Sequence, residues 1–211
     1  MSDIKLVCFD LNKTLIKENS WFDLNLALGV TPQEDQELFD QYQSGEITYL
    51  QWQQKLKDIY ISRGLATRST IESVLFKYTY LPGAQDLVSS LKSKNYNLAI
   101  ISGSIDLVVN RVCSQLGILN GCANNQFIFS STNQLLDLKC VEDDLIFKLN
   151  QVKKYQSQFN LNPSQICCVG DGDNDSLIFE YTGRGITFPS SKISSQAWKI
   201  VDNLSQIKSI L

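Results

Sequence analysis

Residues 6–15, which read LVCFDLNKTL, decide the fold of this chain. The first four are apolar and predict a short strand that is buried on both faces, as in the middle of a parallel sheet. Asp10 follows directly, at the carboxyl end of that strand, where open α/β sheets bind their ligands. The polar residues Asn12, Lys13 and Thr14 then indicate a tight turn. The stretch therefore predicts a central strand that carries a carboxylate into a ligand site.

The overall composition is that of a folded globular protein. The chain has 211 residues, of which 43% are hydrophobic and 19% charged, and its net charge is −3. This length suits one large domain, or one domain with a small insert. No basic run points to nucleic acid as a partner, and neither a signal-peptide pattern nor an apolar run near ~18 residues points to a membrane. We therefore expect a soluble, cytoplasmic protein of undetermined oligomeric state.

The sequence contains no histidine and six cysteines. Without histidine there can be no Ser-His-Asp triad, no Cys–His pair, no phosphohistidine and no histidine-ligated metal. The cysteines form no C-x-x-C pair, which argues against a zinc site, and we expect all six to be reduced thiols without a catalytic role. Carboxylates and lysine must therefore carry any chemistry.

The pattern between residues 17 and 80 is helical. Capping boxes, in which a Ser or Thr is followed three residues later by Glu or Gln, begin at Thr31, Thr48 and Ser69. An apolar i, i+3, i+7 stripe that starts at Trp21 predicts an earlier helix. We therefore predict an insert of four helices.

From residue 81 onward, strands and helices alternate. The predicted strands are 97–101, 126–130, 134–138, 166–169, 185–188 and 200–201, the second and third of which form a small hairpin. The predicted helices are 83–91, 105–116 and 141–155, with another at the end of the chain. Such alternation, with right-handed crossovers, predicts an α/β fold with a doubly wound parallel sheet.

Three polar clusters follow predicted strands, at residues 10–14, 102–104 and 171–175. Parallel strands would bring all three to one edge of the sheet. Several carboxylates gathered there would repel one another unless a cation were bound, and oxygen donors without His or Cys point to Mg²⁺. Asp and Gly also mark ordinary turns after strands. Three clusters in order, each after an apolar strand, favour a functional site.

These clusters resemble the motifs of the haloacid dehalogenase-like (HAD) superfamily, in its phosphoserine phosphatase-like branch. DLNKT at residues 10–14 resembles motif one, IISGS at 100–104 motif two, and GDGDND at 170–175 motif four. Lys148 precedes motif four at a separation that suits motif three, whereas Lys139 does not. The resemblance implies a HAD-like, Rossmann-like core domain of residues 1–16 and 81–211, and a helical bundle cap domain of residues 17–80.

The resemblance also implies catalytic and metal-binding roles. Asp10 would be the nucleophile and would form an aspartyl-phosphate. Mg²⁺ would be held by Asp10, the backbone carbonyl of Asn12 and Asp171, with Asp175 close by. Ser102 and Lys148 would bind the phosphoryl group through a hydrogen bond and a positive charge. The other candidates for substrate binding are Gly103, Asn174, Glu18 and Asn19.

Asn12 departs from the family pattern, which has an aspartate there. That aspartate protonates the leaving alkoxide and then activates water, whereas an amide cannot exchange a proton at neutral pH. General acid–base catalysis typically contributes ~10²–10⁴-fold. Three outcomes stay open: a slow phosphatase that prefers good leaving groups, a long-lived aspartyl-phosphate, or a protein without turnover. An aspartate replaced by asparagine for crystallisation would give the same sequence.

Substrate choice in this branch depends mainly on the cap. Phosphoserine-specific members hold the amino-acid group with a cap glutamate and a cap arginine. The nearest positions here are Asn19, beside Glu18, and Gln54, so the arginine is missing and phosphoserine is not favoured. Three aromatic residues either pack in the cap core, which is the commoner role, or line a pocket for a flat or apolar group: Trp21, Tyr49 and Trp52.

The leading hypothesis is thus a Mg²⁺-dependent phosphatase that hydrolyses a small phosphorylated metabolite, slowly because of Asn12. The alternative is a catalytically silent HAD-like protein that binds a phosphate ligand or has a regulatory role. A metal-independent haloacid dehalogenase would share the Asp10 nucleophile, but the full acidic motif at residues 170–175 argues against it.

Overall fold

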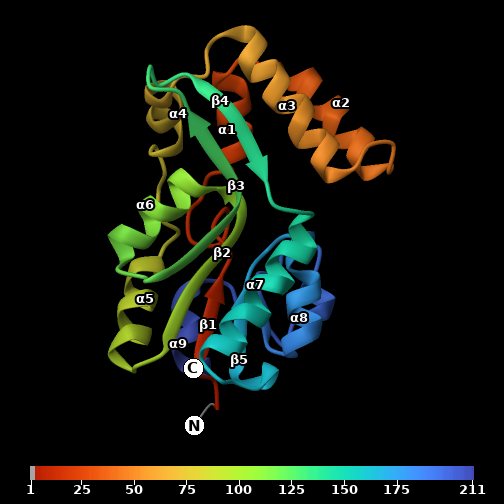
Figure 1. The fold of residues 1–211 in the computed structure, drawn as a ribbon. Helices are drawn as coiled ribbons and strands as arrows, with labels where there is room; N and C mark the ends of the chain where they lie inside the picture. Colours follow the sequence, from red (N-terminus) through yellow and green to blue (C-terminus); the bar gives the residue numbers. More distant parts are fainter. Residues whose placement is uncertain (1–2) are drawn as a thin grey trace.

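The structure, a computed structural model, describes residues 3–211 and contains a seven-stranded sheet with helices on both faces (Figure 1). The strands are β1 (Leu6–Phe9), β2 (Asn97–Ile105), β3 (Asn120–Phe129), β4 (Leu135–Cys140), β5 (Ile166–Val169), β6 (Gly185–Thr187) and β7 (Lys199–Ile200). The α-helices are α1 (Ser20–Ala27), α2 (Pro32–Gln43), α3 (Tyr49–Arg63), α4 (Arg68–Leu75), α5 (Ala84–Ser93), α6 (Asp106–Leu116), α7 (Asp144–Gln158), α8 (Ser176–Thr182) and α9 (Ile207–Ile210).

Strand β1 lies in the middle of the sheet, whose order is β4-β3-β2-β1-β5-β6-β7. It pairs in parallel with β2 and β5, so that Cys8 lies between Ala99 and Cys168. All four of its residues are buried, as their apolar character predicted. The doubly wound α/β sheet is confirmed, although β4 runs antiparallel at one edge. The ends of β1, β2 and β5 therefore lie side by side.

The two faces of β1 enter different hydrophobic clusters, because successive side chains of a strand point to opposite faces. Val7 and Phe9 belong to a large cluster that continues into α5, α6 and the helices that follow β1. Leu6 and Cys8 pack in a smaller cluster with Phe147 of α7. In Figure 1, α5 and α6 lie on one side of the sheet and α7 and α8 on the other. The central strand is thus held from both sides.

Helices α1–α4 follow β1 in the chain, as the helical pattern predicted. The capping boxes at Thr31 and Thr48 are both formed. The predicted cap at Ser69 is wrong, because α4 begins at Arg68 and its N-cap is Thr67. Thr67 also forms an isolated β-bridge with Gln134, the residue before β4, so a contact with a distant segment lies at the start of this helix. The division into a core domain and a cap domain of residues 17–80 stays a prediction.

The β3–β4 hairpin is longer than predicted and joins the sheet to the helical insert. Strand β3 begins at Asn120 and first pairs in parallel with β2, before it pairs with β4. At the far end of the hairpin, the backbone N–H of Leu135 donates to the carbonyl of Ala66 at 2.8 Å, and Lys57 Nζ lies 3.0 Å from Asp137 Oδ1. The hairpin therefore supports the insert beside the strand ends.

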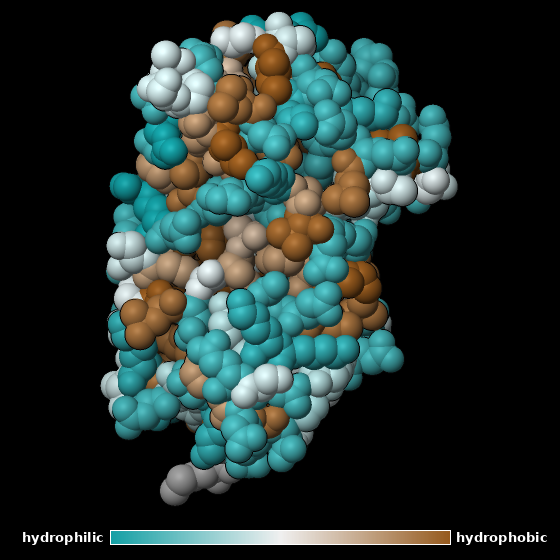
Figure 2. All heavy atoms as spheres, viewed as in Figure 1, coloured by the Kyte–Doolittle hydropathy of each residue, from teal (hydrophilic) through white to brown (hydrophobic). Residues whose placement is uncertain are grey.

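The face seen in Figure 1 is mostly hydrophilic, with hydrophobic side chains gathered in its upper half, over the β3–β4 hairpin (Figure 2). Leu136 of β4 and Val141, the residue after β4, are 58% and 63% exposed. Across residues 3–211, no helix is both long and apolar enough to cross a membrane.

Candidate active site

The ends of β1, β2 and β5 bring the three polar clusters around one cavity of about 190 Å³, here called the strand-end cavity. Residues of all three clusters line it, together with residues of the insert. The predicted site residues in its lining are Asp10, Asn12, Asn19, Ser102, Gly103, Asp171 and Asn174. The convergence that parallel strands predicted is therefore present.

Lys148 is fully buried beneath this cavity, on α7. Its Nζ lies 2.7 Å from Asp10 Oδ1, 2.6 Å from Asp175 Oδ1 and 3.3 Å from Asn174 Oδ1. Burial alone would lower the pKa of Lys148, but the charges of Asp10 and Asp175 outweigh it and hold this pKa above its ordinary value. Lys148 therefore places a fixed positive charge against Asp10.

Asp171 lies near Asp10 without an ion pair to balance it among the described residues. Its Oδ1 accepts a hydrogen bond from Thr14 Oγ1 at 3.2 Å. Burial, together with the charge of Asp10, raises the pKa of Asp171 to about 6. The site thus carries an excess of negative charge, which a cation would relieve.

The donor groups at this point are oxygen atoms, which suit Mg²⁺. Within residues 3–211, no three His, Cys, Asp or Glu side chains gather at metal-binding distance. One reason is that both carboxylate oxygens of Asp175 already accept hydrogen bonds, one from Lys148 Nζ and one from the backbone N–H of Gly172. Mg²⁺ usually keeps several waters and needs only one or two carboxylates. Asp10 and Asp171, which line the same cavity, supply that number of carboxylates.

Two glycines let carboxylates pack directly against the backbone at the strand ends. A Cβ on Gly170 would lie 2.2 Å from Asp175 Oδ2, and one on Gly103 would lie 2.1 Å from Asp144 Oδ2. Any larger residue would displace these carboxylates. Gly170, after β5, and Gly103, within β2, are therefore needed because a carboxylate lies directly against the backbone of each.

Asn12 is tied to the helical insert. Its Oδ1 accepts hydrogen bonds from Ser20 Oγ at 2.7 Å and from the backbone N–H of Ser20 at 3.4 Å. Ser20 is the first residue of α1. The side chain of residue 12 is therefore held at the lining of the strand-end cavity, although an amide neither gives up nor takes a proton at neutral pH.

Ser102 and Ser104 supply hydroxyl groups on the other side of the cavity. Both are almost fully buried, and Ser102 Oγ accepts a hydrogen bond from the backbone N–H of Ser104 at 3.2 Å. Ser104 Oγ is buried without a hydrogen-bond partner among the described residues. The Ser102 hydroxyl hydrogen and the Ser104 hydroxyl are thus free to bind an oxyanion.

The structure does not bring Glu18 to the cavity. Its carboxylate accepts the backbone N–H of Thr79 at 2.9 Å and so links the two ends of the insert. Asn19, by contrast, lines the cavity while its side chain caps α1. Gln54 is exposed and donates to Asp58, whereas its neighbour Gln53 is buried and points into the insert. Gln53, rather than Gln54, is therefore the glutamine of α3 that faces the interior of the insert.

Three further residues of the cavity were not predicted as site residues: Lys13, Ser104 and Asp144. Trp21, expected either in the cap core or in a pocket wall, lines the cavity as well. Asp144 accepts a hydrogen bond from Asn124 Nδ2 at 2.6 Å and one from Asn174 Nδ2 at 3.4 Å. It precedes Lys148 by four residues on α7, so the two share one helix face. Once Lys148 was placed in the site, this spacing was a signal that Asp144 would lie there too.

Replacing Lys148 with methionine is expected to lower the free energy of unfolding by about 3–5 kcal/mol, because Asp10 and Asp175 would lose their buried counter-charge. The measurement is urea unfolding followed by circular dichroism, in EDTA at neutral pH. Lys139→Met removes the same charge from the exposed side of β4, and its effect should stay within about 0.5 kcal/mol. Equal stability of the two variants would contradict the assigned role of Lys148.

Comparison with known proteins agrees with this geometry. Residues 4–181 match the family model of haloacid dehalogenase-like hydrolases. The phosphoserine phosphatase of Campylobacter jejuni subsp. doylei is 27% identical over 99% of this chain and 98% of its own length. That of Archaeoglobus fulgidus is 26% identical over 90% of this chain, which spans only 54% of that longer protein. A solved phospho-aspartyl intermediate analogue of phosphoserine phosphatase superposes with a TM-score of 0.81 at 23% identity, over 99% of both chains.

Proposed function

The chain belongs to the haloacid dehalogenase-like hydrolase family, in its phosphoserine phosphatase-like branch, and on this premise we propose that it is a Mg²⁺-dependent phosphatase acting on a small phosphorylated metabolite. Asp10 is the proposed nucleophile, and the intermediate is an aspartyl-phosphate. A cytoplasmic location stays a prediction, as does the absence of nucleic acid and membrane partners.

The observation that supports this proposal best is the contact between Lys148 Nζ and Asp10 Oδ1, at 2.7 Å, beneath the strand-end cavity. This contact sets the Lys148 ammonium against the carboxyl group of the proposed nucleophile and brings positive charge to the place where phosphate would bind. Ser102 on β2 can donate a hydrogen bond to a phosphoryl oxygen from the opposite side. In the first step, an Asp10 oxygen bonds to phosphorus while the bond to the leaving oxygen breaks.

Mg²⁺ would be held by Asp10, Asp171 and the backbone carbonyl of Asn12. When bound, it offsets the repulsion between the anionic nucleophile and the anionic phosphate. Asp171, which Thr14 orients, contributes the second carboxylate. Asp175 keeps Lys148 in place and so acts on the metal site indirectly.

Asn12 makes both halves of the reaction slow. In the first half, no acid at residue 12 protonates the departing oxygen, so leaving groups that are stable as anions are favoured. In the second half, water attacks the phosphorus of the aspartyl-phosphate and no base at residue 12 takes its proton. We therefore expect aryl and acyl phosphates to be hydrolysed faster than alkyl phosphates.

The test is phosphate release from p-nitrophenyl phosphate in the presence of Mg²⁺. We expect slow turnover that stops on addition of EDTA and returns when Mg²⁺ is added in excess. Mg²⁺-dependent binding of beryllofluoride without any turnover above background would contradict the proposal and favour a catalytically silent phosphate-binding protein.

Mg²⁺ binding is also expected to stabilise the fold without any substrate. At a concentration of 100 times its Kd, a ligand of the folded state adds about 2.7 kcal/mol to the free energy of unfolding. The increase in Tm that results should be lost in Asp171→Asn, since a donor is removed. Asp173→Asn, in the same loop but on an exposed side chain 3.9 Å from Lys192, should keep it. An unchanged increase in Asp171→Asn would remove this residue from the donor set.

A further inference from the structure

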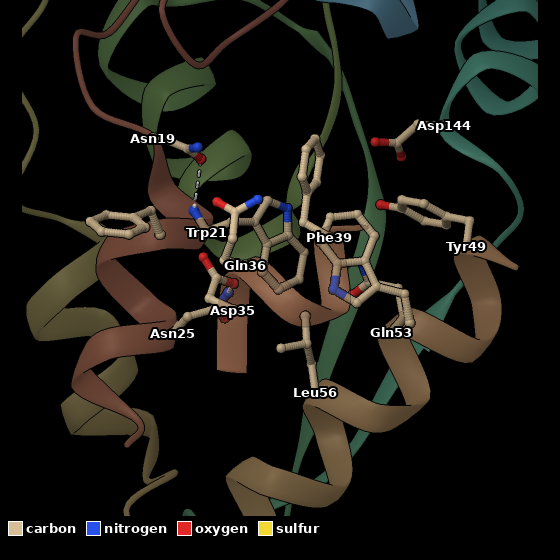
Figure 3. A pocket seen from close by; sticks show the side chains of 12 residues that line it. Asn19, Trp21, Asn25, Asp35, Gln36, Phe39, Tyr49, Gln53, Leu56 and Asp144 are labelled. Atoms are coloured by element: carbon tan, nitrogen blue, oxygen red, sulfur yellow. Dashed lines mark hydrogen bonds between the residues drawn. The ribbon is translucent and has the colours of Figure 1, made fainter. Parts of the chain in front are cut away.

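A second cavity, of about 220 Å³, lies among α1, α2 and α3 (Figure 3) and is here called the insert pocket. It adjoins the strand-end cavity, because Asn19, Trp21 and Asp144 line both. A ligand with its phosphoryl group beside Asp10 could therefore extend its leaving group past Asp144 into the insert pocket.

One wall of the insert pocket consists of aromatic rings from the three helices. Phe39 of α2 and Tyr49 of α3 each contact Trp52 with ring centroids 5.9 Å apart. Trp21 of α1 is held in place by a hydrogen bond of 3.2 Å from its Nε1 to the carbonyl of Gly103. Figure 3 shows the Trp21 and Phe39 rings beside the cavity and the Tyr49 hydroxyl turned towards Asp144. Aromatic rings of this kind attract cations through their electron-rich faces.

The charged groups of the insert pocket are two carboxylates, Asp35 and Asp144, of which Asp144 also lines the strand-end cavity. Gln53 Oε1 and Trp52 Nε1 are buried there without a hydrogen-bond partner among the described residues. The lining residues that the structure describes include no Lys or Arg. Lys148, four residues from Asp144 on α7, already forms ion pairs with Asp10 and Asp175.

We propose that the insert pocket binds a cationic leaving group, so that the substrate is the phosphate monoester of an amino alcohol, with Asp144 as the counter-charge. This inference rests on the proposed phosphatase function. An ammonium group would receive the charge of Asp144 and the aromatic wall together. A carboxylate on the leaving group, as in phosphoserine, would meet no cation in the insert pocket and would be repelled by Asp144. Burial raises the pKa of Asp144, and a bound cation would reverse that effect.

The experiment compares ligands that differ only in charge. Phosphocholine and its neutral isostere 3,3-dimethylbutyl phosphate have the same shape, and phosphoethanolamine and O-phosphoserine differ by a carboxylate. Calorimetry with the wild-type protein and Mg²⁺ gives a Kd for each. We expect the two cationic ligands to bind at least about tenfold more tightly than the neutral isostere, and more tightly than O-phosphoserine.

Asp144→Asn should remove the preference for cationic ligands and leave the Kd of the neutral isostere unchanged. Asp40→Asn is the matched control, since Asp40 is an exposed residue of α2 that lines neither cavity. Its side chain accepts a hydrogen bond from Gln36, which lines the insert pocket, and an amide oxygen can accept the same bond. It should keep the wild-type ratio. Because the ratio is measured first in the wild-type protein, the test does not depend on the variant folding.

Two binding results would overturn the inference: equal Kd values for phosphocholine and its isostere, or the tightest binding for O-phosphoserine. A third is an Asp144→Asn variant that lowers kcat for p-nitrophenyl phosphate but keeps the preference for cationic ligands. Loss of the proposed phosphatase function would appear separately, as absence of p-nitrophenyl phosphate turnover, because the calorimetric ratio needs no turnover.

Discussion

Replacing Asp10 with asparagine is expected to lower phosphate release by on the order of 10⁴-fold or more, to the background rate. The amide is not a nucleophile towards phosphorus, yet it has the shape of the carboxylate and can still accept the hydrogen bond from Lys148 Nζ, now 2.7 Å from Oδ1. The loss should therefore reflect chemistry rather than folding. The measurement is p-nitrophenyl phosphate turnover with Mg²⁺, beside a circular dichroism spectrum of each protein.

Asp173→Asn serves as the control for this experiment, because it removes one carboxylate from the same edge of the sheet at an exposed position. Its turnover should stay near that of the unchanged chain. If Asp10→Asn turned over substrate at the original rate, Asp10 could not be the nucleophile and the assignment of the whole site would fall.

Replacing Asn12 with aspartate is expected to raise turnover by ~10²–10⁴-fold, which corresponds to a barrier lower by about 3–5 kcal/mol. The gain should be largest for alkyl phosphates, whose leaving oxygen needs a proton. The structure supports this direction, since Ser20 Oγ and the Ser20 backbone N–H already donate to Oδ1 of residue 12 and would orient a carboxylate in the same way. The measurement is kcat for an alkyl and an aryl phosphate in both proteins.

Asn19→Asp is the matched control for charge, because residue 19 lines the same cavity and its side-chain oxygen would still cap α1. It should give no gain. A gain in Asn19→Asp as large as in Asn12→Asp would mean that added negative charge, not proton transfer at residue 12, limits turnover. No gain in either variant, with Mg²⁺ bound, would point to a protein that binds phosphate ligands without hydrolysing them.

The residues that could be predicted from the sequence are those whose position follows from local pattern. The apolar run before Asp10 predicted a buried strand, and the parallel order of strands placed Asp10, Ser102 and Asp171 at one edge. Lys148 was predicted from its separation from motif four, and its contact with Asp10 agrees with that.

The errors occurred where a contact between distant segments outweighs local preference. Strand β3 begins at Asn120, in a stretch with little strand character, because parallel pairing with β2 holds it extended. Helix α7 is the exception, because its error has a local cause. It was expected to start at Val141 but begins at Asp144, since the Asp143 side chain accepts the N–H of Leu145 and caps the helix there. Glu18 was assigned to substrate on position alone, and Thr79 takes its carboxylate instead.

By itself the sequence determined the α/β class, the order of the motifs and the residue types available for catalysis, because strand and helix periodicity and the lack of histidine are local properties. Only the tertiary structure decided what surrounds those residues. The contact of Asp144 with Gly103, the pairing of Lys148 with two carboxylates and the insert pocket without a cation all depend on how α7, β2 and the insert pack together. Such packing sums weak interactions between residues far apart in the chain, and no local pattern encodes it.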